Sequence, residues 1–73
     1  MTRDKVEHIV GIVDRSGPYC LNTYSKRERL ALKIADDCNM HRALVLEWIH
    51  DLHGLDLHIE EDRLFLFDYL LNM

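Results

Sequence analysis

One stretch of the chain, residues 29–52, has the hydrophobic spacing of two helices joined by a tight turn. Apolar residues recur there every three or four positions, which is typical of helices with one buried face. The first helix is expected to bury Leu30, Ala31, Ile34, Ala35 and Cys38. The second is expected to bury Val45, Trp48, Ile49 and Leu52. Between them lies Asn39, a residue type that tolerates the left-handed backbone conformation of a tight turn.

Capping residues indicate where this helical pair begins and ends. Ser25 is followed three positions later by Glu28, just before the apolar run. This spacing matches a capping box, in which the serine hydroxyl accepts from a first-turn N–H and the glutamate accepts from the serine's own N–H. Gly54 fits the end of the second helix, because glycine readily adopts positive φ.

The residues before this pair predict another helix and a connector. Thr2 can cap a helix that runs to about Ser16, and Gly17-Pro18 would end it. The buried stripe of this helix would contain Val6, Ile9, Val10 and Val13. Residues 18–24 are expected to form an irregular connector that packs Tyr19, Leu21 and Tyr24 against the helices.

After Gly54 the hydrophobic period changes. Leu55, Leu57 and Ile59 alternate with polar residues, as in a half-buried strand, and residues 64–67 would return as its partner. The connecting turn lacks the Asn-Gly or Asp-Gly that a two-residue hairpin favours. In the alternative interpretation, residues 60–71 form one more helix, with its acidic residues in the first turn. The expected fold is therefore an α+β domain of three helices and a C-terminal β-hairpin, and the alternative is an all-α four-helix bundle.

The helical pair resembles the helix-turn-helix of DNA-binding proteins. That family places a small residue in the first helix, here Ala35, and a turn residue four positions later, here Asn39. It also places a β-branched residue ten positions after the small one, here Val45, and an apolar residue three further on, here Trp48. The family's other apolar positions correspond to Ile34, Cys38 and Met40. With a hairpin after the pair, residues 1–73 resemble a single winged-helix domain.

This resemblance implies transcription-related binding of duplex DNA by a dimer. The second helix of the pair would be the recognition helix and would direct His41, Arg42, Leu46 and His50 toward the bases. The helix before it would direct Lys26, Arg27, Arg29 and Lys33 toward the phosphates.

The charge distribution favours a second hypothesis, a protein-interaction module that keeps the scaffold and does not bind DNA. Residues 1–33 hold seven Lys and Arg against four Asp and Glu, whereas residues 34–73 hold two against nine. Duplex binding draws much of its affinity from cations that meet phosphates, so the acidic half is unfavourable for it. The partner surface would be the acidic face near Leu46 and Glu47 or the apolar tail, and a homodimer is one such assembly. The tail residues are Phe65, Phe67, Tyr69, Leu70 and Leu71.

Other classes of function lack the necessary patterns. His50 and His53 lie about 15 Å along one helix from Cys38 and His41, so these side chains cannot share one tetrahedral metal site. There is no glycine-rich phosphate loop and no nucleophile motif, so we expect a non-enzymatic protein without cofactor, metal or small-molecule substrate. Two cysteines, no signal-peptide pattern and no apolar run of about 18 residues indicate a reduced, cytoplasmic protein that does not enter membranes.

Overall fold

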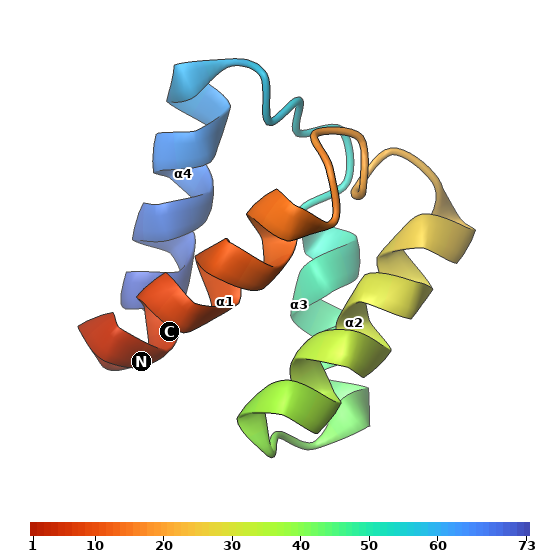
Figure 1. The fold of residues 1–73 in the computed structure, drawn as a ribbon, viewed down its shortest axis with the longest axis vertical. Helices are drawn as coiled ribbons and strands as arrows, with labels where there is room; N and C mark the ends of the chain where they lie inside the picture. Colours follow the sequence, from red (N-terminus) through yellow and green to blue (C-terminus); the bar gives the residue numbers. More distant parts are fainter.

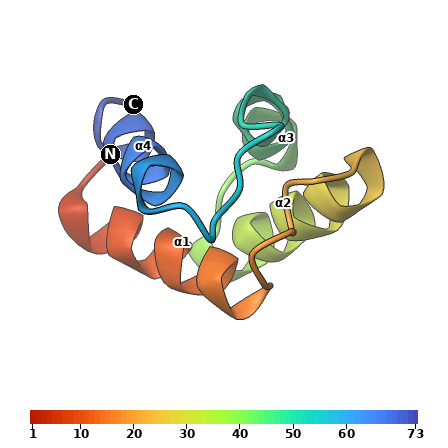
Figure 2. The ribbon, with the colours of Figure 1, turned by 90° about the horizontal axis from the view of Figure 1, so that it is seen from above.

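The computed structural model describes residues 1–73 and contains four α-helices and no β-strand. The helices are α1 (Arg3–Arg15), α2 (Tyr24–Cys38), α3 (Arg42–Asp51) and α4 (Glu60–Leu71). Helix α2 packs most extensively on α3, and α1 contacts both α2 and α4. Figure 1 and Figure 2 show α1 between the α2–α3 pair and α4, with the two chain ends close together. The predicted α+β fold is therefore wrong, and the all-α alternative fits the structure.

The predicted β-hairpin over residues 55–67 is replaced by a turn-rich loop and α4. The Asp56 carboxylate accepts from the His58 N–H at 3.0 Å, and the Asp56 N–H donates to the Asp62 carboxylate at 2.9 Å. These bonds engage backbone groups that a strand would have paired with another strand. The first turn of α4 carries three acidic residues, which the positive end of the helix dipole stabilises. Local side-chain chemistry thus favours a helix where the alternating pattern predicted strands.

Helix α2 begins earlier than the predicted capping box. The Thr23 hydroxyl accepts from the Lys26 N–H at 3.2 Å, so Thr23 is the N-cap and Ser25 lies inside the first turn. The α1 prediction is confirmed, because Thr2 accepts from the Lys5 N–H.

The predicted turn at Asn39 is confirmed. Asn39 has φ 53° and ψ 49°, in the left-handed region, and is the only non-glycine residue with positive φ. Directly after it, the Met40 N–H donates to the Ala35 carbonyl at 2.9 Å, which satisfies one of the free carbonyls at the end of α2. This turn lets α3 fold back on α2.

The core consists of 17 buried residues, all of them apolar. In α1, Ile12 is buried in place of the predicted Val10, which is half-buried, as is Cys38 at the end of α2. In the connector, Leu21 is buried as expected, but Tyr19 and Tyr24 are 52% and 62% exposed. No helix of this fold has both the length and the apolar content that crossing a bilayer requires.

Replacement of Asn39 tests the turn. Asn39→Ala is expected to lower the free energy of unfolding by about 1 kcal/mol, because a Cβ-bearing residue without a short polar side chain is disfavoured in the left-handed region. Asn39→Gly is the matched control and should leave the stability unchanged or slightly higher. Urea unfolding followed by Trp48 fluorescence measures both. An equal loss in the two variants would assign the contribution to the asparagine side chain instead of to the backbone conformation.

Candidate functional site

The basic residues predicted to bind phosphate divide into two groups with different surroundings. Lys26, Arg29 and Lys33 lie on one side of α2 at i, i+3 and i+7, and all three are exposed. None of them forms an ion pair, whereas Arg3, Arg42 and Arg63 each lie within 4.0 Å of a carboxylate oxygen. These three α2 cations are thus available to a ligand.

Arg27 belongs to a separate, internal contact with His50. Its Nε donates to His50 Nδ1 at 3.1 Å, and its Nη1 donates to the Leu21 carbonyl at 2.9 Å. The imidazole of His50 also stacks on the Tyr24 ring, with centroids 4.5 Å apart and an interplanar angle of 11°. Arg27 and His50 therefore join the connector, α2 and α3 to one another, and neither side chain is free to contact a base or a phosphate.

The outer side of α3, the expected recognition helix, has little free positive charge. Arg42 lies 3.7 Å from the Asp36 carboxylate, and Glu47 is exposed one turn further along the helix. His41 is the exposed N-cap residue of α3, and Leu46 is half-buried against the core. The structure therefore does not bring the eight predicted DNA contacts together on one surface.

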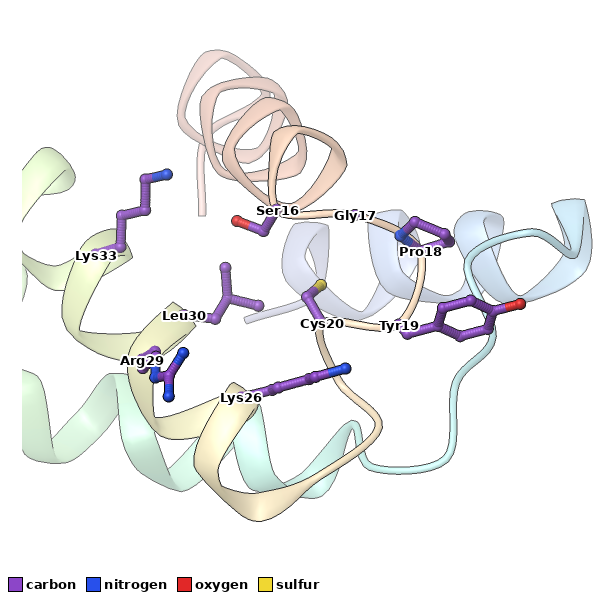
Figure 3. A pocket seen from close by; sticks show the side chains of 9 residues that line it. All are labelled: Ser16, Gly17, Pro18, Tyr19, Cys20, Lys26, Arg29, Leu30 and Lys33. Atoms are coloured by element: carbon purple, nitrogen blue, oxygen red, sulfur yellow. The ribbon is translucent and has the colours of Figure 1, made fainter.

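A cavity of about 470 Å³ lies beside the three free cations of α2. Figure 3 shows these cations on one side and residues 16–20 on the other. The lining residues are Ser16, Gly17, Pro18, Tyr19, Cys20, Lys26, Arg29, Leu30 and Lys33. Burial raises the pKa of the Cys20 thiol, which therefore remains protonated at neutral pH and adds no negative charge. We call this hollow the α2 cavity.

The predicted partner-binding residues of the tail occupy different depths in α4. Leu70 is fully buried, and Phe67, Tyr69 and Leu71 are half-buried against the core. The Tyr69 hydroxyl donates to the Asp51 carboxylate at 3.4 Å, and burial together with that carboxylate raises its pKa. Of the five predicted residues, only Phe65 is largely exposed, at 54%.

The exposed side of α4 centres on Phe65 and on Leu64, which is 57% exposed and was not among the predicted residues. Both side chains lie three or four positions from the acidic residues Glu61 and Asp68. The only cation of this helix, Arg63, pairs with Asp14 at 3.4 Å. We call this surface the α4 outer face, which comprises Glu61, Leu64, Phe65, Asp68 and Asn72. The sequence signal for it is the run of apolar residues at 64–67, because one helix face cannot bury four consecutive side chains.

Comparison with known proteins assigns no family, because no family model, curated protein or solved structure matches the chain. Within the chain, no three His, Cys, Asp or Glu side chains are grouped in a way that could hold a metal ion. The α2 cavity and the α4 outer face are the two candidate binding surfaces of the chain.

Arg27 and Arg29 form a matched pair for separating the internal contact from the cavity. Arg27→Ala is expected to lower the free energy of unfolding by about 1–3 kcal/mol, because it removes the hydrogen bonds to His50 and to the Leu21 carbonyl. Arg29→Ala should change it by less than about 0.5 kcal/mol, since this exposed side chain has no partner. Urea unfolding of both variants gives the comparison. Equal stabilities would contradict the internal role of Arg27.

Proposed function

We propose that this chain is a protein-interaction module that binds its partner through the α4 outer face. The observation that carries the proposal is the pair of adjacent side chains Leu64 and Phe65, each more than half exposed. The opposite side of α4 is already used, because Leu66 and Leu70 are buried in the core. Full burial of one such side chain contributes about 1.5–3 kcal/mol, so a partner that covers both gains appreciable affinity.

The charges of the α4 outer face define the chemistry of the partner. Glu61 and Asp68 lie one turn to either side of the apolar pair, and no cation offsets them. An antiparallel second copy centred on the apolar pair would set Glu61 against Asp68, and a parallel copy would set each acid against itself. Both arrangements oppose like charges, which is unfavourable. The partner we propose is therefore another protein, with an amphipathic helix whose apolar stripe is flanked by lysine or arginine.

DNA binding, the function that the helix-turn-helix resemblance implies, has less support. Arg42, the one Lys or Arg on α3, lies beside Asp36, and His50 is engaged by Arg27 and Tyr24. A duplex would also approach the exposed carboxylate of Glu47. The three free cations on α2 remain available for contacts to DNA phosphates. They do not suffice for sequence-specific recognition, because it also requires contacts to base edges.

The experiment measures fluorescence anisotropy of a synthetic amphipathic helix with leucines at i, i+3, i+4 and i+7 and flanking lysines. Wild-type protein is expected to bind it, and Leu64→Ser or Phe65→Ser should weaken binding about tenfold, since each removes a central apolar contact. The same peptide with flanking glutamates should bind at least about tenfold more weakly.

Leu44→Ser is the matched control, because Leu44 is an equally exposed helical leucine, at 60%, on α3 instead of α4. It should bind the lysine-flanked peptide like wild type. Equal weakening in Leu44→Ser and Leu64→Ser would show non-specific apolar contact and refute the assigned surface. A dimer of wild-type protein in sedimentation equilibrium that Phe65→Ser dissociates would refute the choice of a different protein as the partner.

A further inference from the structure

The lining of the α2 cavity has an excess of positive charge. Lys26, Arg29 and Lys33 line it, and no acidic residue does. Three of the nine basic residues of the chain, Arg3, Arg42 and Arg63, form ion pairs with carboxylates, and the three cavity cations do not. The nearest acid in sequence to residues 16–20, Asp14, acts on the Cys20 thiol but does not line the cavity, and it pairs with Arg63. We infer that the α2 cavity is a binding site for a small organic phosphate.

The position of the cations on α2 supports an anionic ligand independently. Lys26 lies in the first turn of α2, where the helix dipole is positive and where acidic residues are favoured. That turn contains no acidic residue, in contrast to α1 and α4, whose first turns contain Asp4 and three acids respectively. Lysine at this end of a helix is electrostatically unfavourable in the free protein. A bound anion would offset this cost and the mutual repulsion of the three cations.

The charge of the site favours phosphate over a carboxylate. A phosphate monoester has a charge between about −1.5 and −2 near neutral pH and offers three acceptor oxygens. Three separate cationic side chains match three acceptors, whereas a single carboxylate would leave at least one cation without a partner. The guanidinium of Arg29 can also bind two phosphate oxygens at once.

The uncharged part of the lining indicates that the phosphate belongs to an organic molecule. Leu30 and Pro18 supply apolar surface, whereas the ring of Tyr19 points away from the cations and packs against His58 (Figure 3). The volume of about 470 Å³ falls within the range of small-molecule sites, about 300–1,000 Å³, and exceeds what inorganic phosphate needs. The body of the ligand would lie on Leu30 and Pro18 while its phosphate meets the cations.

The same cations face a hollow and therefore suit a small ligand better than a duplex. Phosphates of a duplex follow one another along a strand, and a protein that binds them needs cations spread along its surface. Of the other two cations near α3, Arg27 bonds to His50 and to the Leu21 carbonyl, and Arg42 already has a carboxylate partner. The inference does not rest on the α4 outer face, so either proposal can fail alone.

Isothermal titration calorimetry of the full chain with inorganic phosphate and with adenosine monophosphate, at about 50 mM salt, tests the site. Both should bind, with the nucleotide tighter than phosphate. Arg29→Ala and Lys33→Ala should each weaken both ligands about tenfold, the effect of losing one charge-assisted contact.

Lys5→Ala is the matched control, because Lys5 is an exposed, unpaired cation on α1 that does not line the cavity. It should change neither affinity by more than about twofold. Equal weakening by Lys5→Ala would mean diffuse attraction to positive charge and would overturn the site, as would the absence of binding at ~10 mM of either ligand. Displacement of the nucleotide by a 20-base-pair duplex whose own binding is lost in Arg42→Ala would overturn the small-ligand assignment in favour of DNA.

Discussion

The buried face of α1 is the contact on which the rest of the structure depends, because α1 is the helix that packs on both α2 and α4. Val6, Ile9, Ile12 and Val13 have no exposed surface. Each contributes about 1.5–3 kcal/mol by its burial, which is large beside the 5–15 kcal/mol by which a typical domain is stable. The direct link between α3 and α4 is the hydrogen bond from Tyr69 to Asp51. Without α1, the α2–α3 pair and α4 would lose the one helix that packs on both.

Local patterns predicted those parts of the fold whose determinants are local. The burial of Leu30 and Ile34 on α2, the left-handed Asn39 and the buried face of α3 follow from spacing and turn chemistry within a few residues. The error at residues 55–67 has a specific cause. Alternating Leu55, Leu57 and Ile59 match a strand only if their backbone groups are free to pair, and the carboxylates of Asp56 and Asp62 engage that backbone instead. Hydrophobic period alone does not reveal such side-chain competition.

For the candidate sites too, the sequence revealed groupings of nearby residues and did not reveal contacts between residues far apart in the chain. The sequence identified the cations of α2, since Lys26, Arg29 and Lys33 form a helical stripe. It did not separate them from Arg27, whose partner His50 is 23 positions away and approaches only when α3 folds back on α2. The wall of the cavity at residues 16–20 was missed for the same reason. A cluster of like charges in a sequence therefore does not by itself define a binding surface. In the folded chain, some members of the cluster form contacts with residues far away in the sequence and are no longer available to a ligand.

One short segment connects the α2 cavity with the loop that leads into α4. Residues 16–20 form a wall of the α2 cavity, and the same residues contact the loop that leads into α4. The Pro18 carbonyl accepts from the Leu57 N–H at 3.4 Å, and the Tyr19 ring packs edge-on against His58, with centroids 5.0 Å apart. Pro18 and Tyr19 therefore belong to the cavity wall and also contact the loop before α4. This segment is one packed route between the two surfaces, and thermodynamic reciprocity would make any free energy of coupling through it equal in both directions.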